Sequence, residues 1–134
     1  MKKIIILLIL AGISVWGCKF FQEQKKLSLF KQDYKKINDC LAQHNYKEGI
    51  ESGKKLVDYA TKTFGEMHPC TAQANNRLGR AYKMKWKIGN GSITDRDLAI
   101  KYLKKALGIL DAIPSAGTLM NERGNYADDL ASVY

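Results

Sequence analysis

Three observations predict that this chain folds as an all-α protein. Apolar residues recur three and four positions apart along most of the 134-residue chain, which is the spacing of an α-helical face. The sequence contains only two prolines, so long helices are possible. A pattern of Leu, a small residue, two variable residues and Tyr occurs twice, at residues 78–82 and 130–134. The repeated pattern indicates helical repeats within one domain, which is what a chain of this length supports.

The first 17 residues resemble a secretory signal peptide. Lys2 and Lys3 supply positive charge, an unbroken apolar stretch covers residues 4–13, and the small residue Gly17 precedes Cys18. The apolar stretch is shorter than the roughly 20 residues that a membrane-spanning helix needs. We therefore expect residues 1–17 to direct export and to be removed.

Residues 15–18, Val-Trp-Gly-Cys, resemble a bacterial lipobox, in which the signal is cut before the cysteine and the thiol is diacylated. The resemblance implies lipidation at Cys18 and a lipidated, polar tether over residues 18–25. Trp16 departs from the lipobox pattern, and an ordinary secreted protein cut near Gly17 is the alternative. Lys19 follows the cysteine, as in lipoproteins that a two-membrane bacterium sends to its outer membrane. The expected location is the cell envelope, at the periplasmic face of the outer membrane if there are two membranes.

Five helices are expected after the tether, over residues 26–43, 46–63, 69–87, 95–112 and 118–134. A turn at His44-Asn45 separates the first two. The inner face of the first helix is expected to contain Leu29, Phe30, Tyr34, Ile37, Cys40 and Leu41. That of the second is expected to contain Tyr46, Ile50, Leu56, Val57, Ala60 and Phe64.

The last three helices show the same spacing. The third begins with Pro69, which suits the first turn of a helix, and Thr94 with Asp97 is the expected N-cap pair of the fourth. In the fourth helix Ala99 matches Gly49 of the second, a small residue where two helices cross. The expected inner faces are Ala74, Leu78, Ala81 and Tyr82 in the third helix, Leu98, Ala99, Tyr102, Leu103, Ala106, Leu107 and Leu110 in the fourth, and Tyr126, Leu130, Ala131 and Tyr134 in the fifth.

Residues 65–82, GEMHPCTAQANNRLGRAY, resemble the tetratricopeptide repeat in the longer form found in kinesin light chains and in many bacterial proteins. A helix ends at Gly65, the pair His68-Pro69 follows, and a second helix carries a ridge of Asn and small residues. The resemblance implies antiparallel helix-pair repeats over residues 26–134, forming a short right-handed α-solenoid of about two and a half repeats. It also implies that His68 closes the hinge between two helices.

Two segments depart from that family. Residues 85–94 make a longer connection than the family has, with turn chemistry at Asn90-Gly91-Ser92, and we expect a flexible insertion there, with a partner-contacting loop as the alternative. Ile113-Pro114-Ser115 stands where a second Gly and His-Pro hinge is expected.

The resemblance also implies a concave groove lined by the first helix of each repeat, where another protein or peptide binds. Asn76 and Arg80 are four residues apart and therefore share one stripe of a helix. An Asn can pair with a peptide backbone, and Arg80 with Lys83 can hold a carboxylate. The alternative is that these residues are only a solvated helix face. The groove residues implied are Lys31, Tyr34 and Asn38 on the first helix, Gln73, Asn76, Arg80 and Lys83 on the third, and Asn125, Asp128 and Ser132 on the fifth.

The sequence offers no catalytic constellation, no metal site and no cofactor motif. His44 and His68 are the only histidines, and neither has a ligand partner at metal-site spacing. The repeat frame that the resemblance implies places Cys40 and Cys70 at opposite ends of corresponding helices, roughly 18 Å apart, which is too far for a disulfide. We expect Cys40 to be packed inside and Cys70 to be a surface thiol. Nucleic acid is an improbable partner for an exported chain, despite the formal net charge of +9.

The expected function is therefore that of a protein–protein interaction module at the cell envelope, attached to the membrane through its lipid. The alternative is a structural subunit secreted without an anchor. In that case the apolar face at Leu130 and Tyr134, for which the sequence supplies no further helix, self-associates through the C-terminal helix or belongs to a longer repeat protein.

Overall fold

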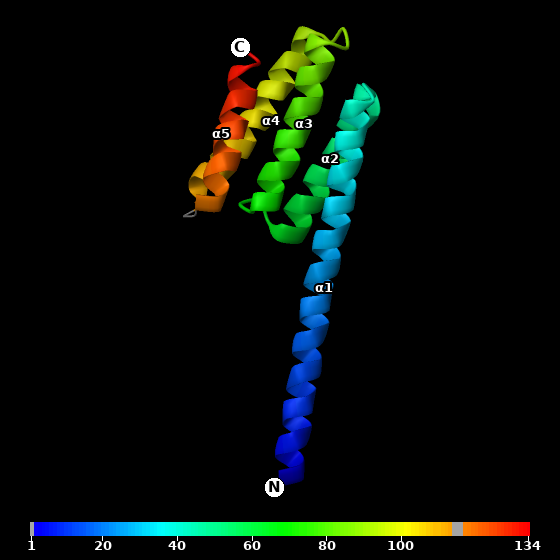
Figure 1. The fold of residues 1–134 in the computed structure, drawn as a ribbon, viewed down its shortest axis with the longest axis vertical. Helices are drawn as coiled ribbons and strands as arrows, with labels where there is room; N and C mark the ends of the chain where they lie inside the picture. Colours follow the sequence, from blue (N-terminus) through cyan, green and yellow to red (C-terminus); the bar gives the residue numbers. More distant parts are fainter. Residues whose placement is uncertain (1, 114–116) are drawn as a thin grey trace.

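The computed structural model describes residues 2–113 and 117–134, and within these residues the chain is helical with no strand. The helices are α1 (Lys2–Ala42), α2 (Tyr46–Phe64), α3 (Pro69–Lys87), α4 (Ile93–Ala112) and α5 (Gly117–Ala131). Consecutive helices run in opposite directions (Figure 1). The predicted all-α fold class is confirmed.

The core is centred on α3, which packs against α1, α2 and α4. Leu78 of α3 and Leu103 of α4 are fully buried, together with Ile37 of α1 and Leu56 of α2. Two glycines let these helices approach closely. A Cβ atom on Gly79 would lie 2.7 Å from Leu103 Cγ, and one on Gly53 would lie 3.0 Å from Leu78 Cδ1. Small residues are therefore required where α3 crosses its two neighbours.

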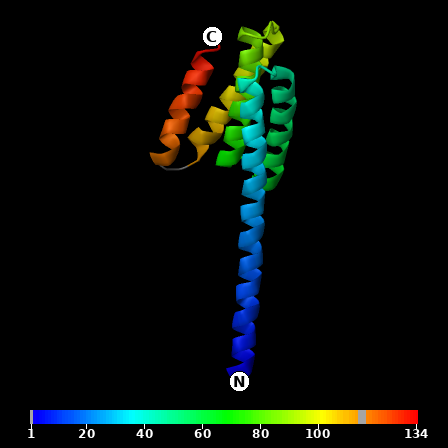
Figure 2. The same cartoon turned by 45° about the vertical axis from the view of Figure 1, so that its right-hand side comes forward.

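Helix α1 is much longer than the sequence predicted. The expected helix start at residue 26 is wrong, because one helix continues from Lys2 to Ala42 and includes residues 18–25. The segment contains no proline and no cluster of turn-forming residues, so nothing interrupts the helix. Its N-terminal half projects away from the other helices in both views (Figures 1 and 2). Among the residues of α1 whose burial is described, Phe30 is the first that is fully packed. Within the described residues, no helix is both long enough and apolar enough to cross a membrane.

The hinge between α2 and α3 has the structure that the His-Pro pair implied. His68 is the N-cap of α3, and its Nδ1 atom accepts a hydrogen bond of 3.1 Å from the backbone N–H of Cys70. The His68 ring stacks on Phe64 with 5.0 Å between centroids, and Thr71 Oγ1 donates a 2.6 Å hydrogen bond to the carbonyl of Gly65. Gly65 has a φ of +100°, which a side chain would disfavour. The structural role predicted for His68 is confirmed; the second hinge, at residues 113–115, lies mostly outside the described residues.

The connection between α3 and α4 differs from the expected insertion. Only residues 88–92 join the two helices, and Gly91 N–H donates a 2.9 Å hydrogen bond to the carbonyl of Lys85. A Cβ on Gly91 would lie 2.6 Å from Trp86 Cα, so this short loop is packed against the end of α3. The predicted N-cap pair of Thr94 and Asp97 is also wrong, by two residues. Ser92 is the N-cap of α4.

Asp95 completes the N-cap of α4. Its Oδ2 atom accepts a 2.8 Å hydrogen bond from the backbone N–H of Ser92, and Oδ1 lies 3.0 Å from Lys85 Nζ. Burial by itself raises the pKa of Asp95, but the hydrogen bonds from Ser92 and Lys85 outweigh it, and the pKa lies below its ordinary value. The carboxylate therefore stabilises the helix terminus in its ionised form.

Two further expectations about burial are corrected. Cys40 is buried as predicted, but Cys70 is also buried, with 8% of its surface exposed, because it lies in the first turn of α3 beneath the hinge. In α5 only Tyr126 of the predicted inner face is fully packed. Leu130 is half-buried, whereas Ala131 and Tyr134 are exposed. The helix ends at Ala131, so the chain leaves the helical register and turns Val133 into the core instead.

Candidate functional site

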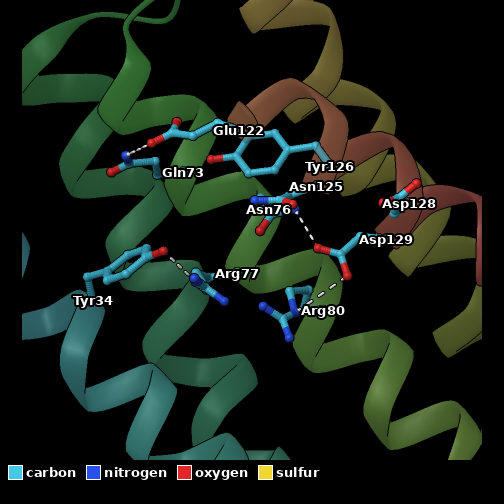
Figure 3. A pocket seen from close by; sticks show the side chains of 10 residues that line it. All are labelled: Tyr34, Gln73, Asn76, Arg77, Arg80, Glu122, Asn125, Tyr126, Asp128 and Asp129. Carbon is cyan, nitrogen blue, oxygen red and sulfur yellow. Dashed lines mark hydrogen bonds and ion pairs between the residues drawn. The ribbon is translucent and has the colours of Figure 1, made fainter. Parts of the chain in front are cut away.

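A hollow of about 460 Å³ lies between α1, α3 and α5, three helices that are not consecutive in the chain. Its volume is within the range of ligand-binding pockets, about 300–1,000 Å³. Figure 3 shows the ten side chains that line it, nearly all of them polar. They are Tyr34 from α1, Gln73, Asn76, Arg77 and Arg80 from α3, and Glu122, Asn125, Tyr126, Asp128 and Asp129 from α5.

Helix α3 supplies the floor because of its amphipathic sequence. Gln73, Asn76, Arg77 and Arg80 fall at intervals of three and four residues, which places them on one stripe. Ala74, Leu78 and Ala81, also spaced by three and four, are buried in the core on another face. The same helix thus packs with one stripe and presents polar side chains with the other.

Tyr34 of α1 holds the Arg77 side chain at one side of the hollow. Arg77 Nε donates a 2.6 Å hydrogen bond to the Tyr34 hydroxyl, and the guanidinium carbon lies 4.7 Å from the centre of the same ring. Both contacts are with a neutral partner. Among the described residues no carboxylate lies within ion-pair distance of Arg77.

Asp129 of α5 joins that helix to α3. Its carboxylate accepts hydrogen bonds from Lys83 Nζ at 2.7 Å and from Asn76 Nδ2 at 3.2 Å, and Arg80 Nε lies 3.6 Å away. The Lys83 and Asp129 side chains are only 15% and 16% exposed, so solvent screens this pair weakly. Arg80 and Lys83, predicted to hold a ligand's carboxylate, therefore face a carboxylate of the chain itself.

Glu122 lies at the other end of the hollow. Its Oε1 atom accepts a 3.0 Å hydrogen bond from Gln73 Nε2, whereas the buried Oε2 atom has no partner among the described residues. Arg80 Nε is likewise buried and lacks a hydrogen bond there, because its 3.6 Å separation from Asp129 exceeds hydrogen-bond length. Two opposite groups, one acceptor and one donor, thus remain unsatisfied in one hollow.

Tyr126 is buried behind these groups. Burial, with a contribution from the neighbouring Glu122 charge, raises the pKa of the Tyr126 phenol far above its ordinary value. The hydroxyl consequently stays protonated at any physiological pH and is available as a hydrogen-bond donor.

The hollow contains six of the ten groove residues predicted from the sequence: Tyr34, Gln73, Asn76, Arg80, Asn125 and Asp128. Lys83 and Ser132 do not line it but bond to each other at 3.1 Å beside Asp129. Lys31 and Asn38, also on α1, do not line it either.

Sequence reasoning missed four lining residues, Arg77, Glu122, Tyr126 and Asp129. Arg77 was identifiable, since it lies four residues after Gln73 and three before Arg80 on the predicted stripe. Tyr126 had been assigned to the core, where most of its ring does lie. The roles of Glu122 and Asp129 depend on contacts between residues 49 and 53 positions apart, which local spacing does not reveal.

No group of His, Cys, Asp and Glu side chains within the described residues is arranged to hold a metal ion. Comparison with known proteins adds no identification. No protein-family model matches the sequence, and no curated protein matches it significantly.

Proposed function

We propose that this chain is an interaction module whose groove between α1, α3 and α5 binds an extended segment of another protein. The observation that carries the proposal is the convergence of ten side chains from three helices, with Arg80 Nε and Glu122 Oε2 left unsatisfied. An unsatisfied buried polar atom costs about 1–3 kcal/mol. A bound peptide backbone offers both N–H donors and C=O acceptors, which can pair with the polar side chains that line the hollow.

The arrangement of helices supports a relationship to the tetratricopeptide repeat. The helices follow one another in antiparallel pairs, α1 with α2 and α3 with α4, and α5 begins a third unit. The groove is lined by the first helix of each unit, as the resemblance of residues 65–82 implies. A right-handed solenoid of about two and a half repeats is part of this proposal.

The proposal includes export and lipid attachment at Cys18. Cys18 is exposed on the projecting part of α1, away from the groove, so an acylated Cys18 leaves the groove open to a partner. Acyl chains contribute about 0.8 kcal/mol per buried methylene to membrane attachment. Measurement of the intact mass after expression in a bacterium that processes lipoproteins tests this part. A mature chain beginning at Cys18 with added acyl mass is expected, whereas an uncut chain, or one without acyl mass, contradicts lipidation.

Self-association is the second candidate, and exposed apolar residues in α5 and just after it favour it. Tyr134 and Met120 are 70% and 73% exposed, although both are large and apolar. Light scattering of the purified protein distinguishes the two functions. A mass that stays monomeric over a hundredfold range of concentration excludes self-association.

Selection of peptides from a random display library tests peptide binding. The purified full-length chain in detergent serves as bait, and the double variant Asn76→Ala with Arg80→Ala serves as the comparison. We expect selected peptides to bind the double variant at least tenfold more weakly than the wild type. The matched control is Lys54→Ala with Lys55→Ala, which changes two exposed residues of α2 and should leave binding unchanged. If the groove double variant and the control double variant bind the selected peptides equally tightly, and circular dichroism shows that both are folded, the groove assignment is contradicted.

A further inference from the structure

The charges in the groove are divided between its two sides. Lys83 is hydrogen-bonded to Asp129, and Arg80 Nε lies 3.6 Å from the same carboxylate. Arg77 and Glu122, in contrast, each contact a neutral partner, the Tyr34 hydroxyl and the Gln73 amide. Both are half-buried and line the same hollow, and no ion pair joins them within the described residues. In Figure 3 Glu122 lies beside Gln73, and Arg77 lies beside Tyr34.

We propose that the groove selects an extended peptide segment with one acidic and one basic side chain two positions apart. Arg77 binds the acidic side chain, and Glu122 binds the basic one. The inference rests on the proposed function, since it specifies which peptides the groove accepts.

Arg77 is prepared to bind a carboxylate. Its Nε atom is used by the Tyr34 hydroxyl, and the Tyr34 ring supports the guanidinium plane, which leaves the two terminal nitrogens for a ligand. Two parallel hydrogen bonds from guanidinium to carboxylate are the strong, directional form of this interaction. Because Tyr34 already fixes the side chain, less conformational entropy is lost when the ligand binds. Asp129 does not compete, since Lys83 holds it at 2.7 Å.

Glu122 is prepared to bind a cation. One carboxylate oxygen accepts from Gln73, and the other is buried without a partner. Glu122 is half-buried and has no ion pair among the described residues, and a Lys or Arg side chain of the ligand supplies the opposite charge. Asp128 adds a second carboxylate to the α5 side of the hollow and has no ion pair among the described residues. The α5 side is therefore negative where the Arg77 side is positive.

The spacing of the two ligand charges follows from α3. Glu122 is held by Gln73, which lies four residues before Arg77, and four residues advance about 6 Å along the axis of α3. An extended chain advances about 3.3 Å per residue, and side chains two positions apart point to the same face. Residues at positions i and i+2 of the ligand therefore span about 6.6 Å and reach both groups.

A set of end-blocked peptides on a Gly-Ser background tests the inference by fluorescence anisotropy with the full-length chain in detergent. The set contains Asp and Lys two positions apart in both orders, the same residues five positions apart, and a neutral version with Asn and Gln. We expect one order of the two-position spacing to bind at least tenfold more tightly than the five-position and neutral peptides. Arg77→Glu should shift the preference to two basic residues, and Glu122→Lys should shift it to two acidic residues, because each change reverses one side of the groove.

The controls are Lys54→Glu and Glu51→Lys, the same charge reversals at exposed positions of α2, which should leave the preference unchanged. If Arg77→Glu does not fold, Arg77→Gln removes the charge with less change in shape and should abolish discrimination between Asp and Asn in the ligand. Library peptides that bind in the groove but keep their charge preference in these variants overturn the inference while the proposed function stands. Failure of the library to yield any groove-binding peptide overturns both.

Discussion

The close crossing of α3 and α4 at Gly79 can be tested with a pair of glycine substitutions. Both Gly79→Ala and Gly108→Ala replace a glycine inside a helix, and each should gain about 1 kcal/mol from the higher helix propensity of alanine. A Cβ at Gly108 would have no atom within 4 Å, so Gly108→Ala should raise the free energy of unfolding by about 0.5–1 kcal/mol.

Gly79→Ala introduces a steric conflict. The new methyl group would lie 2.7 Å from Leu103 Cγ, 2.9 Å from Leu103 Cδ2 and 3.1 Å from the Leu103 backbone nitrogen. The side chain of Leu103 is fully buried and the backbone of α4 cannot yield locally, so overpacking should cost about 1–3 kcal/mol. After the propensity gain is subtracted, the free energy of unfolding should fall by up to about 2 kcal/mol.

Urea unfolding of both variants and the wild type, followed by circular dichroism, gives the two changes under identical conditions. The difference between the variants removes the shared propensity gain and should be about 1–3 kcal/mol. If Gly79→Ala stabilises the protein as much as Gly108→Ala does, the two helices do not cross at Gly79 and the reasoning is refuted.

Three further outcomes are expected. The pKa of Asp95 in the folded protein lies below its ordinary value. Asp95 therefore stabilises the fold at any pH above that ordinary value, and this stabilisation is lost as the pH falls through the lowered pKa. Asp95→Asn should cost about 0.5–2 kcal/mol at neutral pH and flatten the acid limb of the pH–stability curve. An acid limb that matches that of the wild type contradicts this assignment. In unprocessed protein, Cys70 should react with iodoacetamide far more slowly than the exposed Cys18, because Cys70 is buried and burial raises the pKa of its thiol. Equal reaction rates of the two cysteines in the folded protein would disprove the burial of Cys70. Asp129→Ala removes the polar contacts of Asp129 with α3, so it should increase amide hydrogen exchange across residues 117–131 at least tenfold and leave exchange in α2 unaffected. Unchanged exchange in α5 would contradict the role of Asp129 in holding α5 on α3.

Local signals in the sequence predicted the middle of the fold most closely. Helix α3 has the predicted bounds, because Pro69 and the residues around His68 determine its start through backbone geometry and capping. The start of α4 was misplaced because Ser92 and Thr94 are both suitable cap residues, and the choice depends on Lys85 and Asp95 meeting at the end of α3. When two local signals for a helix start are of similar strength, tertiary contacts determine which residue becomes the cap.

The groove was predictable to the extent that it depends on helix periodicity. The resemblance implied Gln73, Asn76 and Arg80 as groove residues, and their helical spacing places them on one stripe of α3. The hydrogen bond between Lys83 and Asp129 could not be predicted from spacing, because the two residues are 46 positions apart and the contact forms only once α5 is packed on α4. The turn of Val133 into the core likewise depends on where α5 ends.

The central claim is that the groove between α1, α3 and α5 binds a peptide. The most direct test is to map backbone amide chemical-shift changes by NMR when a library-selected peptide is added to the isotopically labelled protein in detergent. If the peptide binds in this groove, the largest chemical-shift changes should cluster at residues 34, 73–80 and 122–129, on the three helices that line the hollow. Changes concentrated on α2 and α4, with those three segments unaffected, would contradict it.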